Sequence, residues 1–322
     1  MPKYMIKRVL SAFLTILVVF SLNFIIINAA PGSPIKTMMG KEVDNIELQK
    51  ALEKKYGFDQ PLHKQYLKYL ENVSKGDLGV SVIYNRPVKD MILEKLGPTI
   101  LLVLSSAIIS LILGTGMGIS AARKEGSLLD VIFSSVNYIL NSMPSFWLGL
   151  MLVIIFSTKL DLLPTFGMTD PRADYEGIWY VLDVLKHLIL PVLTMVLIQI
   201  PLYFRIAKSS VLQVINEDYI QTFRACGMSE EKIFNKYIFK NAILPTITIF
   251  GISIAYLVTG VALVEIIFAW PGTGRLVLNA INQRDYPTLM GIYLVMSISI
   301  AVVMMIVDII YAFVDPRIRY GD

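Results

Sequence analysis

Few side chains in this sequence of 322 residues could carry out chemistry. Cys226 is the single cysteine, and the two histidines, His63 and His187, lie far apart in the chain, so we expect no metal centre built from these residue types. The sequence contains no HExxH, GxSxG, CxxC or GxxxxGK[ST] motif. We therefore predict no catalytic residue, no metal site and no cofactor bound by this chain.

Glu265 and Asp308 are the acidic residues that fall within long apolar stretches. An ionisable side chain inside a bilayer is costly and often functional, and Arg275 is a possible partner for Glu265. Both acids lie close to the ends of their stretches, where hydration is the ordinary alternative explanation. A proton relay needs several such groups, so the sequence shows no means by which this chain alone could supply energy for transport.

The composition is typical of a polytopic membrane protein: 55% of residues are hydrophobic and 17% are charged, whereas soluble domains have roughly a quarter charged. The net charge of +4 is too small to indicate nucleic-acid binding. We predict an all-α fold with about six transmembrane helices. The expected spans are Val9–Ala29, Leu96–Ala122, Val131–Thr158, His187–Ile206, Ala242–Phe268 and Met290–Phe313.

The spans divide the chain into three parts. Residues 1–30 form a first transmembrane helix, residues 31–97 a polar excursion, and residues 98–322 a core with a charged loop at 207–242. Within the excursion, helices are expected to open near Asp44, Pro61 and Pro87. The excursion is predicted to be a small helical cap, with direct ligand binding as the alternative.

Basic residues indicate the orientation in the membrane. They gather around the charged loop and recur at the short turn Arg123–Lys124 and near both ends of the chain. The positive-inside rule then places the loop and both termini in the cytoplasm. The residues concerned at the loop are Arg205, Lys208, Arg224, Lys232, Lys236 and Lys240.

Small residues and prolines mark special points in the spans. A stripe of small residues recurs every four positions in the second span and predicts close contact with another helix: Ser106, Ser110, Gly114, Gly118 and Ala122. Pro144 should kink the third span, and Trp270–Arg275 should form a non-helical turn with Trp270 at the membrane interface. Irregular backbone at membrane depth lines cavities. The predicted pathway or gate residues are therefore Pro144, Phe146, Trp147, Glu265, Trp270 and Arg275.

Glu217–Pro245, the loop segment, is expected to form a short helix, a tight glycine turn and a second helix outside the membrane. With Gly227 at C′, Met228 and Phe223 occupy the positions that close a Schellman turn, and Ser229 can cap the second helix. Tyr219, Phe223 and Met228 would form an apolar wedge for a partner's pocket. A membrane-surface amphipathic hairpin is the alternative.

The loop segment resembles the cytoplasmic EAA loop of ABC-importer permeases. The family's Glu-Ala-Ala positions are occupied by Gln221, Thr222 and Phe223, so the triplet itself is absent. In this respect the loop resembles that of the peptide-importer branch of the family. The residues that fit the pattern of that branch are Asp218, Tyr219, Thr222, Arg224, Ala225, Gly227, Leu244 and Pro245. Further stretches resemble this branch in order along the chain, among them YGFDQPL, GDLGVS, PSFWLGL, HLILP, FAWPGTGRL, RDYP and DPRIRY.

The resemblance implies a non-catalytic, multi-pass cell-membrane permease of type I fold, serving an importer for oligopeptides or dipeptides. Nickel or another small ligand is the alternative cargo, and a self-sufficient secondary carrier is the rival class. The implied partners are a second homologous permease, two cytoplasmic ATPases that bind ATP and magnesium, and an extracellular or periplasmic substrate-binding protein. The implied ATPase-docking residues are Tyr219, Gln221, Thr222, Phe223, Arg224, Ala225, Cys226, Gly227 and Met228.

Overall fold

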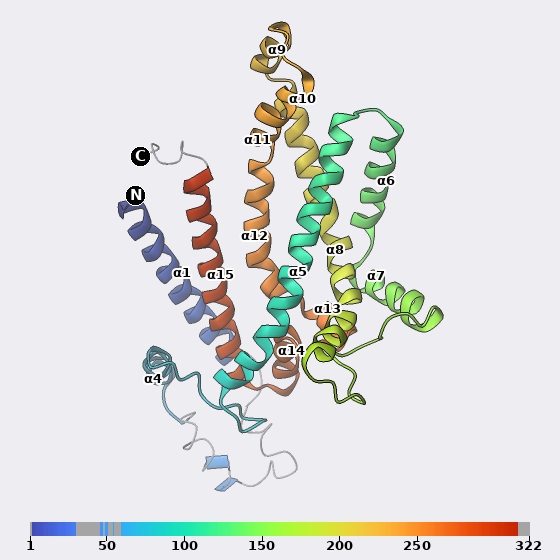
Figure 1. Cartoon of the computed structure of the whole chain (residues 1–322). Helices are drawn as coiled ribbons and strands as arrows, with labels where there is room; N and C mark the ends of the chain where they lie inside the picture. Colours follow the sequence, from blue (N-terminus) through green and yellow to red (C-terminus); the bar gives the residue numbers. More distant parts are fainter. Residues whose placement is uncertain (1, 30–45, 48, 51–53, 55–58, 315–322) are drawn as a thin grey trace. The chain divides into compact units, whose positions relative to one another are not determined.

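The computed structural model describes the whole chain except residues 1, 30–45, 48, 51–53, 55–58 and 315–322 (Figure 1). The described residues form helices and one isolated bridge between Val80 and Pro87, which confirms the all-α prediction. The helices are α1 (Pro2–Ala29), α4 (Leu62–Ser74), α5 (Val88–Arg123), α6 (Leu128–Ser142), α7 (Ser145–Leu152), α8 (Gly177–Ile215), α9 (Asp218–Ala225), α10 (Glu230–Ile233), α11 (Phe239–Ala242), α12 (Leu244–Gly260), α13 (Ala262–Ile267), α14 (Thr273–Gln283) and α15 (Tyr286–Val314). Two π-helical segments, η2 (Val153–Lys159) and η3 (Phe234–Ile238), continue α7 and α10.

Five helices in the described residues are long and apolar enough to cross a membrane, or six if the bent pair Leu128–Ser142 and Ser145–Lys159 is one span. The two members of that pair meet at 105°. Pro144 therefore breaks the third span outright, where a kink was expected. Met143, the residue before the proline, is extended at φ −84° and ψ 132°, as the proline ring demands.

Several predicted helix boundaries were wrong in the same way: the helices are longer than the apolar stretches from which the spans were predicted. The helix expected to open at Pro87 is the beginning of α5, which continues to Arg123 with Pro98 inside it. Likewise α8 begins at Gly177 and contains Pro191 and Pro201. Pro61 is the N-cap residue of α4, as expected. The helix predicted near Asp44 falls largely outside the described residues.

The chain separates into two compact units. The first unit comprises Met1–Thr99 and Pro271–Val302, and the second comprises Ile100–Trp270 and Val303–Asp322. Residues 271–302 therefore group with the N-terminal part of the chain. Each unit has its own buried core.

In the first unit, aromatic side chains join α1 to α4. Phe20 stacks on Tyr69 with ring centroids 5.2 Å apart, and Phe24 meets Tyr66 edge-on at the same separation. The hydroxyl oxygens of Ser21 and Tyr66 are 2.7 Å apart and share a hydrogen bond. The amphipathic α4 therefore packs its aromatic face against α1, and the Ser21–Tyr66 hydrogen bond satisfies the tyrosine hydroxyl within that contact.

A buried carboxylate holds the start of α15 in the first unit. The hydroxyls of Ser81 and Thr288 donate to Oδ2 of Asp285 at 2.5 Å and 2.7 Å, and the backbone N–H of Val82 donates to Oδ1 at 3.2 Å. All three side chains are fully buried. These donors satisfy the carboxylate within the protein.

We predict that Asp285→Ala lowers the melting temperature of the protein in detergent. The change leaves two buried hydroxyls and one N–H without their acceptor, and each such group costs about 1–3 kcal/mol. Asp90→Ala, which removes an exposed carboxylate from the first turn of α5, is the matched control. Equal shifts for the two variants would show that the buried network contributes no stability.

In the second unit, α8 packs against the described elements around it. Its apolar side chains share a core with residues of α5, α13 and the segment that follows α13. Trp270 belongs to this core and is fully buried, so its expected place at the membrane interface was wrong. The helix α14 begins at Thr273, so only the first half of the predicted turn Trp270–Arg275 is non-helical.

The small-residue stripe of α5 faces α8 as predicted. A Cβ atom added to Gly114 would lie 2.8 Å from Cβ of Tyr203, and one added to Gly118 would lie 2.5 Å from the carbonyl oxygen of Phe204. Real Cβ atoms do not approach backbone oxygens so closely. Glycine is therefore required at these two positions by contact, because the helix backbones themselves touch.

Gly118→Ala should lower the melting temperature, since the added methyl group forces α5 away from α8. Overpacking of this kind costs about 1–3 kcal/mol. Gly116→Ala is the control on the same helix, because an added Cβ there meets nothing within 4 Å. The control should be neutral or slightly stabilising, since alanine favours helix. A destabilised Gly116→Ala variant with an unaffected Gly118→Ala variant would contradict the packing.

Candidate functional site

The loop segment contains the predicted glycine turn. Gly227 has φ +77°, the left-handed conformation that glycine adopts without strain. The N–H of Met228 donates to the carbonyl of Phe223 at 3.1 Å, and the N–H of Gly227 donates to that of Arg224 at 3.0 Å. These are the two bonds of a Schellman turn, so the predicted end of α9 is confirmed.

The second helix of the loop segment differs from its prediction. Ser229 is the N-cap residue of α10, but its side chain makes no capping hydrogen bond. The helix then passes through η3 and α11 into α12 without an intervening loop. The segment is thus a short helix and a turn mounted directly on a long helical element, with α9 at its tip (Figure 1).

A small apolar core lies beneath α9. Ile220, Ile233 and Ile238 are almost completely buried there, together with Val211 of α8 and Ala122 of α5. Phe223 and Met228 are half-buried against the same cluster, so both point inward, whereas the predicted wedge had them facing a partner. Ile220 was missed by the sequence argument, although its spacing from Phe223 places both on one face of α9.

The loop segment is tied to the ends of α5 and α8. The guanidinium carbon of Arg123, the last residue of α5, lies 4.4 Å from the ring centroid of Phe234. The Phe223 and Tyr237 ring centroids are 4.3 Å apart, which joins α9 to η3. Together with the buried core that includes Val211 of α8, these contacts connect α9 to both long helices, so a force applied to α9 is passed to them.

Most of the predicted docking residues form the exposed side of α9 and its turn. The exposed members are Tyr219, Gln221, Thr222, Arg224, Ala225, Cys226 and Gly227. Arg224 is paired within the segment: its Nε donates to Oε1 of Glu230 at 2.7 Å and its Nη2 to Oε2 at 3.3 Å. A carboxylate of the same segment therefore already engages this predicted docking residue.

The predicted pathway residues are dispersed. Pro144 lies at the α6–α7 break, and Phe146 and Trp147 are exposed on α7. Glu265 is fully buried in α13, and its carbonyl accepts a hydrogen bond from the N–H of Trp270 at 2.8 Å. Arg275 is exposed and belongs to the first unit. The side chain of Asp308 lies outside the described part of the structure.

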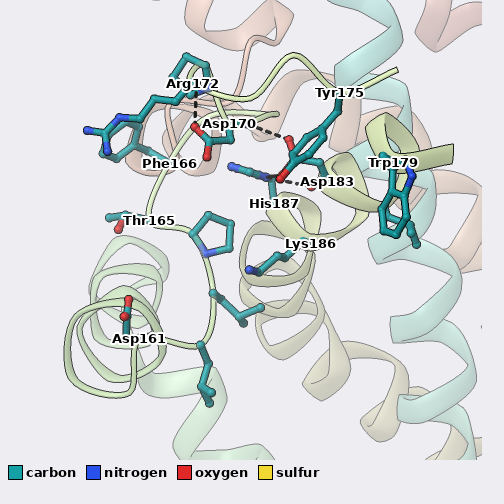
Figure 2. A pocket seen from close by; sticks show the side chains of 15 residues that line it. Asp161, Thr165, Phe166, Asp170, Arg172, Tyr175, Trp179, Asp183, Lys186 and His187 are labelled. Carbon is teal, nitrogen blue, oxygen red and sulfur yellow. Dashed lines mark hydrogen bonds and ion pairs between the residues drawn. The ribbon is translucent and has the colours of Figure 1, made fainter. Parts of the chain in front are cut away.

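One cavity of about 540 Å³ lies between residues 161–175 and the first turns of α8 (Figure 2). Its wall is held by Asp183, whose Oδ2 accepts from the N–H of Asp170 at 2.7 Å and whose Oδ1 lies 3.2 Å from Nδ1 of His187. The N–H of Gly167 donates to the carbonyl of Phe268 at 2.8 Å. These hydrogen bonds hold residues 161–175 against α8 and against the segment that follows α13.

A second cavity of about 360 Å³ lies between α6 and α8, within the candidate spans. An ion pair lies at its edge, where Nζ of Lys208 contacts Oδ1 of Asp130 and donates to the hydroxyl of Ser134 at 3.2 Å. The polar side chains that line the cavity are Ser134, Asn137 and Asn141 from α6, and Arg205, Lys208 and Ser209 from α8. In the residues that the structure describes, no group of three or more His, Cys, Asp or Glu side chains could hold a metal ion.

Two family models match the chain. Residues 114–320 match the binding-protein-dependent transport system inner membrane component, and residues 1–103 match the N-terminal part of such membrane components. Together the two matches leave only residues 104–113, within α5, and the last two residues of the chain unassigned.

Full-length relatives carry related names. The chain is 36% identical over 321 residues to the oligopeptide transport system permease protein AppB of Bacillus subtilis, covering 99% of this chain and 100% of the relative. It is 34% identical over 337 residues to the dipeptide transport system permease protein DppB of Alkalihalophilus pseudofirmus, with 99% and 100% covered. It is also 34% identical over 320 residues to the glutathione transport system permease protein GsiC of Escherichia coli, with the same coverage.

A solved structure shares the fold. A chain of the MetNI methionine ABC transporter, in an inward-facing conformation, superposes with a TM-score of 0.55 at 15% identity, covering 70% of this chain and 96% of that one. The likeness supports the type I permease fold. The chain belongs to the family of binding-protein-dependent transport system inner membrane components, and it is a multi-pass, non-catalytic permease subunit of an ABC importer.

Proposed function

We propose that this permease serves an ATP-driven importer for oligopeptides or dipeptides and forms half of its translocation pathway. Its full-length relatives are named for oligopeptide, dipeptide and glutathione transport, and glutathione is itself a short peptide. The observation that carries the coupling part of the proposal is the loop segment, in which an exposed α9 is mounted on a buried core shared with α5 and α8.

In the proposed assembly, a second homologous permease completes the pathway and two cytoplasmic ATPases bind ATP and magnesium. An extracellular or periplasmic substrate-binding protein delivers the peptide. The basic residues around the loop segment support a cytoplasmic position for α9 and for both termini. The pathway is proposed to involve the α6–α7 break with Pro144, Phe146 and Trp147, and the region of Glu265, Trp270 and Arg275.

The mechanism is a rigid-body transition. The ATPases close when they bind ATP, and α9 moves with the ATPase surface on which its exposed residues rest. Because Ile220 and Phe234 link the segment to Val211 of α8 and to Arg123 of α5, those helices move with it. The permease contributes no covalent chemistry.

Cys226 offers a direct test of docking, since it is exposed and is the single cysteine of the chain. In the assembled complex, it should form crosslinks to cysteines engineered on the ATPase surface that is proposed to receive α9. Failure of crosslinking at every engineered position, in a complex that hydrolyses ATP, would contradict contact at this face.

Transport by the reconstituted complex tests the function. Uptake of di- to pentapeptides into proteoliposomes should require ATP, both ATPases and the receptor. Uptake of nickel in place of peptides would indicate the other cargo. Transport by this chain alone, driven by an ion gradient and abolished by Glu265→Gln, would instead identify a secondary carrier.

A further inference from the structure

The cavity between α6 and α8 lies near the ends of these helices that are proposed to be cytoplasmic. Lys208, in its wall, contacts Asp130 in the first turn of α6, directly after the short turn that joins α5 to α6. Leu212, also in the wall, packs against the apolar core beneath α9. The proposed orientation therefore places the cavity at the level of the lipid headgroups of the cytoplasmic leaflet.

The charges around the cavity leave one cation in excess. Arg205 and Lys208 line it, and no acidic side chain of the described chain is among the lining residues. Lys208 is satisfied by Asp130 and by the hydroxyl of Ser134. Arg205 is exposed and has no ion-pair partner in the part of the chain that the structure describes. Its guanidinium, whose forked donors match the geometry of a phosphate, is the group that an entering anion would meet.

The rest of the wall is suited to a ligand with an apolar part. Tyr138 lines the cavity with its residue 80% exposed, and its neighbour Ile139 on α6 is exposed as well. Exposed apolar side chains of a membrane span face acyl chains, and tyrosine is enriched where the bilayer meets water. On α8 the wall continues from Arg205 with Phe204 and Pro201. A ligand at Arg205 is therefore beside lipid.

The lining residues of α8 are ordered as the parts of a phospholipid are. From Lys208 toward the middle of the membrane, the charged side chains of Lys208 and Arg205 are followed by Phe204 and Pro201. These residues span about 10 Å of helix at about 1.5 Å per residue. Asn141, exposed on the facing side of the cavity, carries an amide that can donate to ester oxygens.

We propose that this cavity binds the headgroup of an anionic phospholipid of the cytoplasmic leaflet, with Arg205 holding the phosphate and the acyl chains lying beside Tyr138. Basic pockets between transmembrane helices on the cytoplasmic side bind such headgroups. A volume of about 360 Å³ falls within the usual range of small-ligand sites. The proposal rests on the proposed orientation of the chain and does not depend on which cargo is transported.

A soluble phosphate compound is the competing occupant, because Arg205 would bind its phosphate in the same way. Such a compound would leave the exposed ring of Tyr138 and the apolar wall at Phe204 and Pro201 without a partner in the ligand. A phospholipid supplies the phosphate and the apolar part in one molecule. The combination of Arg205 with these apolar side chains therefore favours the lipid.

The test measures occupancy of the cavity beside Arg205. Ser209→Cys, four residues further along the same face of α8, is introduced into the full permease–ATPase complex. The complex is placed in nanodiscs of phosphatidylcholine with increasing fractions of phosphatidylglycerol. Alkylation of the cysteine by N-ethylmaleimide, which is uncharged, is followed by mass spectrometry of the fragment that contains it.

Gln213→Cys is the matched control. Gln213 is exposed one turn further along α8 and does not line the cavity, so a cysteine there experiences the charge of the bilayer surface without a bound headgroup. Nanodiscs expose both faces of the bilayer and carry the anionic lipid in both leaflets. A negative result therefore counts against the site, whereas the proposed orientation and the proposed transport function are left standing.

We expect phosphatidylglycerol at about ten times its dissociation constant to slow alkylation of Ser209→Cys about tenfold, since about one site in ten is then open. Gln213→Cys should change little. Adding Arg205→Gln should raise the required fraction of phosphatidylglycerol at least about tenfold, because it removes a charge-assisted, forked contact. Arg205→Lys should lie between the two. Lys240→Gln, which removes an exposed cation outside the cavity lining, should leave the protection unchanged.

Four outcomes would overturn the proposal. Equal protection of Ser209→Cys and Gln213→Cys, or protection that survives Arg205→Gln, would show a general effect of an anionic surface. Protection by glycerol phosphate in nanodiscs of phosphatidylcholine alone would make the cavity a site for a soluble anion. Protection by trialanine, with none by phosphatidylglycerol, would make it a contact of a transported peptide. Absence of protection at every fraction of phosphatidylglycerol would remove the site.

Discussion

Gly227→Val should reduce substrate-stimulated ATP hydrolysis by the assembled transporter at least about tenfold, because a β-branched residue held in the left-handed region costs on the order of 1–3 kcal/mol. At φ +77° the substitution disfavours the two hydrogen bonds of the Schellman turn. The eight-residue α9 then loses its fixed end and no longer transmits movement to α5 and α8. Insertion into the membrane should be unaffected, since the spans are unchanged.

A control with the same local strain separates coupling from folding. Gly126, in the turn between α5 and α6, has φ +75°, and an added Cβ there meets nothing within 4 Å, as at Gly227. Gly126→Val should therefore impose a similar backbone strain without touching α9. Both variants are compared by ATP hydrolysis with and without loaded receptor, and by the amount of complex recovered. Equal losses in the two variants would show that general strain, rather than the α9 turn, is responsible.

Local features of the sequence predicted the structure well where short-range geometry decides the outcome. The end of α9 follows from Phe223, Gly227 and Met228 at the spacing that a Schellman turn requires. The contact of α5 with α8 follows from Gly114 and Gly118, because only residues of this size let two helix backbones touch. Each of these two predictions needs only the residues of a single helix, α9 in the first case and α5 in the second.

Features that depend on neighbouring elements were missed. Phe223 and Met228 were assigned to a partner because nothing in α9 alone reveals the apolar ends of α5 and α8 beneath it. Trp270 was placed at the membrane interface for its residue type, whereas the second unit encloses it. Hydropathy also places the end of a predicted span at the first charged residues. The helices α5 and α8 nevertheless continue beyond the apolar part of their sequences.

The polar stripe of α6 was overlooked because Asp130, Asn137 and Asn141 each look isolated among apolar neighbours. A sequence-level signal existed in their helical spacing, since they fall on one face together with Ser134. The structure adds what one helix cannot show, namely the cavity between α6 and α8 and the pairing of Asp130 with Lys208. The docking and pathway assignments remain predictions that the proposed experiments address.

Asp130→Asn should lower the melting temperature of the protein in detergent, because it leaves Lys208 without its carboxylate partner. The Asp130 side chain is about 10% exposed and that of Lys208 about 22%, so the charge left behind is poorly hydrated. Breaking a fully buried ion pair from one side costs about 3–5 kcal/mol, and this partly buried pair should lose less than that. Lys208→Met should cost less, because Asp130 keeps the N–H of Gly126 at 3.2 Å and the hydroxyl of Ser134 at 3.1 Å.

The double variant Asp130→Asn/Lys208→Met decides whether the pair itself stabilises the protein. Because it removes both charges, its melting temperature in detergent should lie above that of Asp130→Asn, although it carries one more substitution. Glu125→Gln, an exposed acidic residue in the adjoining turn, should leave the melting temperature unchanged. If the two single effects simply add in the double variant, the carboxylate and the ammonium act independently, and α6 is held to α8 by its apolar contacts alone.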